Sequence, residues 1–249
     1  ISSGQDIHFE TLDLSEKFND RITSIFKKQY FSPRSLSPTL AIPVQGIGDW
    51  CSFTETAEID DSGLRNLAGN TNTIRSPQGI PFTTPGTGGP NILFTSKWDN
   101  YPDSVRLKLT GKASHLYLLM AGSGHHMQSR MTNGVVTVEY TDGTIEELLL
   151  ISPDNWWPVE QDFYEDGYAF RIDAVRPLRL HLKTGEWHLI SYDILSKNKT
   201  RKIDGGAASV LDLPLNPQKE LKQLTLETRT NDVVIGLMAA TLKRENPKI

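Results

Sequence analysis

Apolar and polar residues alternate along several short stretches of the chain, which is the pattern of half-buried β-strands. In residues 104–109 the apolar positions alternate with basic ones, whereas residues 115–121 are apolar on both faces, as expected of a strand in the middle of a sheet. The strand predictions are residues 91–95, 104–109, 115–121, 135–140, 144–151, 169–173, 178–182, 188–195, 209–213, 221–229 and 233–243.

The spacing of these segments predicts the fold class. Roughly ten to twelve short strands follow one another with almost no helix between them, which indicates an all-β protein built as an antiparallel β-sandwich or jelly roll. Residues 141–144, Thr-Asp-Gly-Thr, predict a hairpin turn. The alternation also predicts a core made of Leu116, Leu118, Met120, Val136, Val138, Leu149, Leu180, Leu182, Leu224, Leu226, Ile235 and Leu237.

The first part of the chain has a different pattern. Residues 14–30 carry apolar side chains at helical spacing, which predicts one amphipathic helix. Residues 31–43 are rich in Pro and Ser, which is typical of an extended linker. Either the sandwich or a preceding domain would cover the apolar face of this helix. Further along, residues 61–65 predict a short helical turn that begins at Asp61 or Ser62.

The composition of the chain excludes some classes of binding partner. The 249 residues carry a net charge of −4, whereas a nucleic-acid backbone needs a basic face. No apolar run approaches the roughly 20 residues that a membrane span requires. The single cysteine, Cys51, excludes a disulfide within the chain. The sequence starts at Ile1 without a signal peptide, and we expect it to be a piece of a larger protein.

The residues that could carry a reaction do not form a known catalytic pattern. Adjacent His125 and His126 would point to opposite faces of a strand, which does not favour a shared metal ion. Ser123 lacks the glycine that a nucleophile elbow requires two residues earlier, because Ala121 stands there. Acidic pairs in loops are typically solvated. We therefore expect no catalytic residue, no metal and no cofactor, and we do not expect the chain to be an enzyme on its own.

Aromatic side chains gather in the predicted loops beside side chains that form directional hydrogen bonds. Sugars offer flat C–H faces to aromatic rings and hydroxyl groups to amides and carboxylates. The candidate carbohydrate-binding residues are Trp98, Asp99, Asn100, Tyr101, His126, Gln128, Arg130, Trp156, Trp157, Glu160 and Gln161. If the preceding strands run parallel, the loops 98–101, 123–130 and 155–162 leave the sandwich at the same end. The same tryptophans could instead plug the ends of the sandwich or lie in a contact between domains.

Several short segments of the sequence support a resemblance to a known group of proteins. They are IPVQGIGDWC (42–51), DSGLR (61–65), SPQGIPF (76–82), WDNYP (98–102), GKASHLYLLMAGS (111–123), HMQSR (126–130), NWWPVEQD (155–162) and DVVIGLMAATLKR (232–244). Together they resemble the C-terminal β-sandwich region of large secreted, glycoside-hydrolase-like proteins of carbohydrate-degrading bacteria, in families of unknown function. The resemblance covers residues 40–244.

The resemblance implies a galactose-binding-like or jelly-roll module beside a catalytic domain of the same protein. On this interpretation, residues 1–39 are the tail of that upstream domain and residues 40–249 form the sandwich domain. A secreted, periplasmic or cell-surface location is implied as well.

Two functions follow from these observations. The first is a non-catalytic carbohydrate-associated β-sandwich module of a secreted polysaccharide-degrading protein, which would bind a plant or host glycan. The second is a structural module that docks on and completes a glycoside hydrolase catalytic domain without binding sugar itself. A small hydrolase is a third reading, which the missing catalytic patterns disfavour. Exposed, roughly coplanar rings at Trp98, Trp156 and Trp157 would favour the first function, and rings buried under the N-terminal helix or under residues 45–90 would favour the second.

Overall fold

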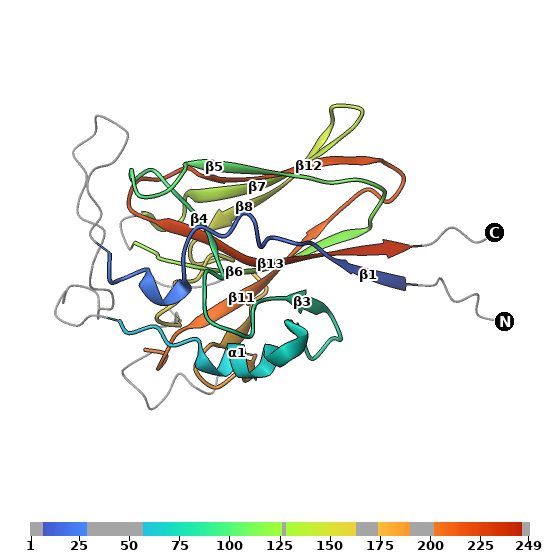
Figure 1. Cartoon of the computed structure of the whole chain (residues 1–249). Coiled ribbons are helices and arrows are strands. Elements are labelled where there is room, and N and C mark those ends of the chain that lie inside the picture. The colour runs from blue at the N-terminus through green and yellow to red at the C-terminus, as the bar shows by residue number, and fades with distance from the viewer. Residues whose placement is uncertain (1–6, 29–56, 126–127, 163–173, 190–201, 246–249) are drawn as a thin grey trace.

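The structure is a computed structural model that describes residues 7–28, 57–125, 128–162, 174–189 and 202–245. Two antiparallel β-sheets lie face to face, and an outer layer with one short helix and a small hairpin covers the other face of the larger sheet (Figure 1). The chain is an all-β sandwich, as the strand spacing predicted.

The larger sheet has seven strands in the order β1-β13-β6-β11-β9-β10, and β4 pairs with the first part of β13. Their bounds are β1 Ile7–Thr11, β4 Leu93–Ser96, β6 His115–Gly122, β9 Leu178–His181, β10 Trp187–His188, β11 Ala207–Pro214 and β13 Val234–Glu245.

The smaller sheet has four strands in the order β5-β12-β7-β8. Their bounds are β5 Ser104–Lys108, β7 Thr132–Tyr140, β8 Ile145–Ile151 and β12 Leu221–Thr228. The predicted hairpin turn joins β7 to β8, where Gly143 has a φ of 82° and donates its N–H to the carbonyl of Tyr140 at 3.0 Å. The outer layer contains the hairpin of β2 (Thr73–Arg75) and β3 (Pro81–Thr83), the helix α1 (Ser62–Ala68), and the 3₁₀ turns η1 (Ile22–Ser24) and η2 (Gly69–Thr71).

Strands β6 and β13 separate two hydrophobic cores. Side chains that point toward the smaller sheet, such as Leu118 of β6 and Ile235 of β13, form the core between the sheets, which we call the inter-sheet core. The alternate side chains, such as Leu119 and Met238, point the other way and form the outer core with the outer layer. Successive residues of a strand point to opposite faces, so a strand covered on both sides must be apolar throughout. This is the reason for the apolar run that predicted β6 as a central strand.

The predicted core is confirmed except at one position. All of its members are buried apart from Leu149, whose exposed fraction is 42%. Leu149 belongs to a run of three leucines in β8, and any of them could face the core by composition alone. In the structure Leu150 is fully buried and Leu148 packs against the inter-sheet core, so Leu149 points to the outer face of the sheet.

The predicted helix over residues 14–30 is wrong for the part that the structure describes, residues 14–28. This part consists of turns and the 3₁₀ turn η1. The apolar side chains are buried as expected, but Leu14 joins the inter-sheet core whereas Ile22 joins the outer core. Between them, Asn19 hydrogen-bonds both the N–H and the carbonyl of Phe94 at 2.8 and 2.9 Å, which ties the chain to strand β4 instead of to a helix.

The N-terminal residues also pair directly with the sandwich. Strand β1 pairs with the end of β13 from Ile7↔Glu245 to Thr11↔Thr241. Residues 7–28 therefore pack on the sandwich, whereas the predicted linker and the boundary at residues 39 and 40 lie outside the described residues. The only α-helix of the described chain is α1, which begins after Asp61 at the predicted helical turn. The strand predicted at residues 169–173 also lies outside the described residues.

Candidate functional site

The strands that precede the three predicted loops all end at one end of the sandwich, which is the left side of Figure 1. Strands β4 and β6 both run antiparallel to β13, and their last residues pair with its beginning, as Ser96↔Val234 and Gly122↔Ile235. Strand β8 ends at the start of β7, with the pair Thr132↔Ile151. This register places the described parts of the three loops, residues 98–101, 123–125, 128–130 and 155–162, at the same end of the sandwich, as predicted.

The aromatic rings of the first loop are buried in the outer core. Trp98 and Tyr101 each have an exposed fraction of 4%. The Tyr101 hydroxyl donates a hydrogen bond to Oδ2 of Asp20 at 2.6 Å, and its ring centroid lies 5.0 Å from that of Phe94. Burial raises the pKa of Asp20, but hydrogen bonds from Lys28, Tyr101 and a backbone N–H outweigh it and lower the pKa overall. Tyr101 therefore links the N-terminal segment to strand β4 of the larger sheet, and Trp98 is buried in the same outer core.

The polar residues of the first loop lie nearer the surface. Asp99 is exposed and Asn100 is partly buried. Because the rings of Trp98 and Tyr101 are buried, the first loop presents no aromatic face to solvent. It offers a potential ligand polar contacts only.

Trp156 and Trp157 are buried as well, each with an exposed fraction of 1%. Trp156 lies in the inter-sheet core and donates its Nε1–H to the carbonyl of Ser123 at 3.0 Å. A Cβ added to Gly122 would lie 2.7 Å from Cζ2 of Trp156, so the absence of a side chain at Gly122 makes room for the ring. Trp157 donates its Nε1–H to the carbonyl of Pro153 at 2.7 Å. The prediction that one of these rings offers a stacking face is wrong, because both are packed against the chain itself.

In the second loop, His126 lies outside the described residues. Arg130 is exposed and has a φ of 59°. It binds the segment between β8 and the third loop, donating its N–H to the carbonyl of Ser152 at 2.7 Å and its Nη1–H to Oδ1 of Asp154 at 3.0 Å. Gln128 is half-buried and donates its Nε2–H to Oδ2 of Asp232 at 3.0 Å. Both side chains thus link chain segments to one another at this end.

Arg179 of β9 organises the third loop, and the sequence reasoning missed it. Its guanidinium is fully buried and donates to the carbonyls of Pro158 at 2.8 Å and Gln161 at 3.2 Å, to Oγ of Ser209 at 2.7 Å, and to Asp162 at 3.2 Å. Its Cζ also lies 5.7 Å from the ring centroid of Trp157. An arginine between two leucines in a predicted strand was the available signal, but its burial cannot be read from alternation.

Glu160 lies beside this arginine and is buried, with an exposed fraction of 6%. Burial raises its pKa from 4.5 to about 7, although the charge of Arg179 acts in the opposite direction. No donor in the described chain reaches its Oε2 atom. The neighbouring Gln161 is only partly buried and forms a bridge with Lys202. Glu160 therefore faces the protein interior, where a sugar hydroxyl in solvent would not reach it.

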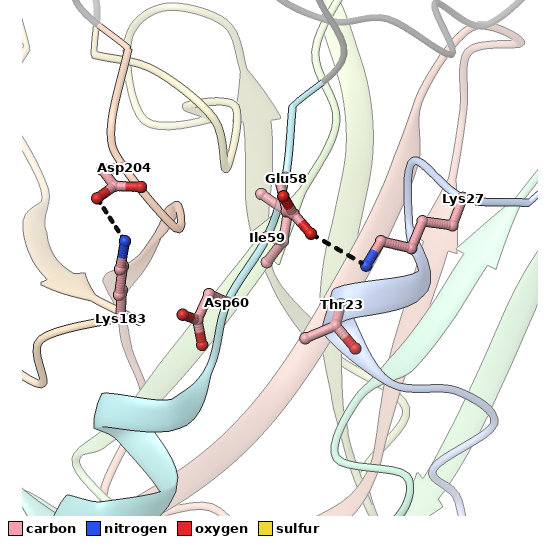
Figure 2. Close-up of a pocket in the computed structure, with 7 residues that line it drawn as sticks. All are labelled: Thr23, Lys27, Glu58, Ile59, Asp60, Lys183 and Asp204. Carbon is pink, nitrogen blue, oxygen red and sulfur yellow. Dashed lines mark hydrogen bonds and ion pairs between the residues drawn. The ribbon is translucent and has the colours of Figure 1, made fainter.

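A polar pocket of about 520 Å³ lies next to the third loop (Figure 2). Figure 2 shows Asp60 between two ion pairs, Lys27–Glu58 at 3.7 Å on one side and Lys183–Asp204 at 2.7 Å on the other. The lining residues are Thr23, Lys27, Glu58, Ile59, Asp60, Lys183 and Asp204.

Backbone hydrogen bonds connect the pocket to the third loop. The N–H of Asp60 binds the carbonyl of Gly205 at 3.0 Å, and the N–H of Ile203 binds the carbonyl of Glu160 at 2.8 Å. The Asp60 carboxylate accepts the N–H of Ser62 at 2.9 Å, and this hydrogen bond lowers its pKa. The pocket can accept and donate hydrogen bonds to a polyhydroxylated molecule. No sequence motif marked it, because its residues come from four separate segments.

The comparisons with known proteins do not assign the chain to a family. No protein-family model matches the chain, and no curated protein matches it either. In the part of the chain that the structure describes, no helix has the length and apolar character needed to cross a membrane.

Proposed function

We propose that this chain is a non-catalytic structural β-sandwich module that docks on and completes a glycoside hydrolase catalytic domain. The observation that carries this proposal is the burial of Trp98, Trp156 and Trp157, whose exposed fractions are between 1% and 4%. Rings that stack on sugars must present a face to solvent. Buried rings instead stabilise the sandwich, which favours the structural function over glycan stacking.

A difference between the two sheets also supports this proposal. The larger sheet is covered on both faces by the chain itself, through the inter-sheet core and the outer core. On the outer face of the smaller sheet, β8 exposes Ile145 and Leu149, with exposed fractions of 50% and 42%. Apolar side chains that lie together on an exposed sheet face, as Leu149 does beside its partner Val135 in β7, mark a contact surface.

The resemblance supplies the context of the proposal. The partner would be the upstream catalytic domain of the same protein, and the whole protein would degrade polysaccharides in a secreted, periplasmic or cell-surface location. None of these properties requires that residues 1–249 touch the sugar.

The proposal is tested by introducing charge on the outer face of the smaller sheet. In the full-length protein, the double variant Ile145→Glu/Leu149→Glu should lower the unfolding temperature of the catalytic domain, because charged side chains would disrupt the contact. Lys108→Glu at the other edge of the same face is the matched control and should leave that temperature unchanged. An unchanged unfolding temperature in the double variant, together with binding of the isolated chain to a glycan array, would contradict the proposal.

A second candidate function, sugar binding, is favoured by the polar pocket of Figure 2. Its volume of about 520 Å³ lies in the range of small-ligand pockets, and its carboxylates and ammonium groups suit sugar hydroxyls. This candidate does not depend on the tryptophans.

Asp60→Asn tests the second candidate. The new amide keeps an oxygen that can accept the N–H of Ser62 but loses the charge inside the pocket. Any glycan affinity measured by calorimetry should then fall, whereas Asp142→Asn should leave it unchanged, because Asp142 makes the equivalent hydrogen bond to Thr144 in the β7–β8 turn. Equal affinity in the wild type and in Asp60→Asn would exclude the pocket.

A further inference from the structure

Three buried oxygen atoms at the loop end have no hydrogen-bond donor among the described residues. They are Oε1 of Gln128, Oδ1 of Asn133 and Oδ1 of Asp232, and we call these three residues the polar corner. Gln128 lies in the second loop, Asn133 in β7 of the smaller sheet, and Asp232 just before β13 of the larger sheet. A buried polar atom without a partner is costly, and three acceptors together need an explanation.

The three side chains form one connected cluster. Gln128 donates its Nε2–H to Oδ2 of Asp232 at 3.0 Å. Asn133 donates both hydrogens of its amide, to the carbonyl of Gln128 at 2.9 Å and to the carbonyl of Met131 at 2.8 Å. The unpartnered oxygens therefore belong to groups that touch one another or one another's backbone.

Rotating the amide groups of Asn133 and Gln128 does not provide better hydrogen-bond partners. Rotating Asn133 by 180° about χ2 would place its oxygen against two carbonyl oxygens. Rotating Gln128 would place its oxygen against the carboxylate of Asp232. The present hydrogen bonds thus fix the unpartnered amide oxygens of Gln128 and Asn133 as acceptors, and Oδ1 of an ionised Asp232 is an acceptor as well.

The charge of Asp232 is also not compensated. Its exposed fraction is 7%, and within the described ranges no Lys, Arg or His forms an ion pair with it. Burial alone raises the pKa of Asp232, with no neighbouring charge contributing. A buried anionic group surrounded by acceptor oxygens attracts a positively charged species that accepts oxygen ligands.

We propose that the polar corner binds a calcium ion through Gln128 Oε1, Asn133 Oδ1 and Asp232 Oδ1. Calcium takes six to eight oxygen ligands from carboxylates, amide carbonyls and water, in a flexible geometry, whereas magnesium prefers a stricter octahedral shell and retains its waters. One carboxylate and two amide oxygens correspond to a site of modest affinity, roughly in the 10⁻⁴–10⁻³ M range of extracellular calcium modules. The ion would connect the second loop to both sheets, independently of the proposed function.

Thermal unfolding of the full chain tests this site. After treatment with EDTA, calcium chloride at constant ionic strength and pH 7.5 should raise the unfolding temperature by roughly 3–6 °C at ten times the dissociation constant. Magnesium chloride should have a much smaller effect. Equilibrium dialysis should find one calcium ion per chain.

Two variants and one control make the test specific. Asp232→Asn should lose the calcium-dependent rise, whereas Asp154→Asn, a partly exposed carboxylate at the same end, should keep it. Gln128→Glu adds a second carboxylate to the corner, so it should unfold at a lower temperature in EDTA and show a larger rise with calcium. This second variant keeps the test decisive if Asp232→Asn does not fold.

The alternative occupant of the corner is a proton on Asp232. In that case the wild type would gain more thermal stability than Asp232→Asn as the pH falls, and calcium would have no effect. That result, or an equal calcium-dependent rise in the wild type and in Asp232→Asn, would overturn the proposal.

Discussion

The two hydrophobic cores of this protein share strands β6 and β13 but are built in different ways. The inter-sheet core comes almost entirely from alternate residues of long paired strands. The outer core faces the same sheet from the other side, and its cover consists of η1, α1, the β2–β3 hairpin and the loop that carries Trp98 and Tyr101. Periodicity therefore identifies a core made by two regular elements, whereas a core covered by irregular segments leaves little pattern in the sequence.

The largest expected effects come from leucines in the two cores. Leu118→Ala in the inter-sheet core and Leu64→Ala in the outer core should each lower the free energy of unfolding by about 2–5 kcal/mol, because both side chains are fully buried. Leu149→Ala, on an exposed side chain of β8, should change it by less than about 0.5 kcal/mol. Urea unfolding measures all three. A small effect of Leu64→Ala would show that the outer core is an accessory layer.

Glu160 links the third loop to the interior and should make stability depend on pH. Its pKa is raised from 4.5 to about 7 in the folded chain, so the folded state retains a proton that the unfolded state releases. The free energy of unfolding should therefore fall as the pH rises from about 4.5 to about 7, and the loss should be complete above that range, at about 3 kcal/mol.

Glu160→Gln tests this dependence, because glutamine carries no charge at any pH. Urea unfolding at pH 4 and pH 8 should show that the variant loses less stability than the wild type between the two values. Parallel pH curves for the two proteins would indicate that Glu160 is ionised at no cost, and that the third loop is more open than the structure shows.

The smallest expected effects come from removing one tyrosine hydroxyl in each core. Tyr101→Phe in the outer core removes a hydrogen bond to the buried Asp20 carboxylate and should cost about 1.5–3 kcal/mol, the range for a charged partner. Tyr140→Phe in the inter-sheet core removes a hydrogen bond from the N–H of Asn216 and should cost about 1 kcal/mol. The reverse order in urea unfolding would indicate that the Tyr101 contact is weak and that the N-terminal segment is held mainly by apolar packing.

The sandwich could be predicted because most of its strands show a clear pattern in their own local sequence. Strands β5, β6, β7, β12 and β13 alternate or are apolar throughout, and their register buries the predicted residues. The position of Leu149 could not be predicted, because three successive leucines leave the register of β8 open. The helix predicted in the N-terminal segment failed for a different reason. Helical spacing and burial by two separate cores produce the same apolar positions, and only the contacts of Asn19 with Phe94 distinguish them.

The candidate site was predictable in its location but not in its chemistry. The order of strands and loops correctly brought three loops to one end. Whether an aromatic ring at that end faces solvent depends on what packs against it. Trp156 needs the space above Gly122, and Trp157 lies against Arg179, which is distant in sequence. The polar pocket was missed, and only Gln128 of the polar corner was among the candidate residues, because each is assembled from segments that share no motif.

The loop tryptophans are part of the core and not a sugar-binding face. This is tested by the free energy of unfolding of Trp156→Ala, with glycan binding measured on the same sample. Because Trp156 is buried in the inter-sheet core and hydrogen-bonded to Ser123, the variant should lose about 3–5 kcal/mol. A loss below about 0.5 kcal/mol, the level of ordinary surface substitutions, together with weakened glycan binding by a fully folded variant, would contradict the account.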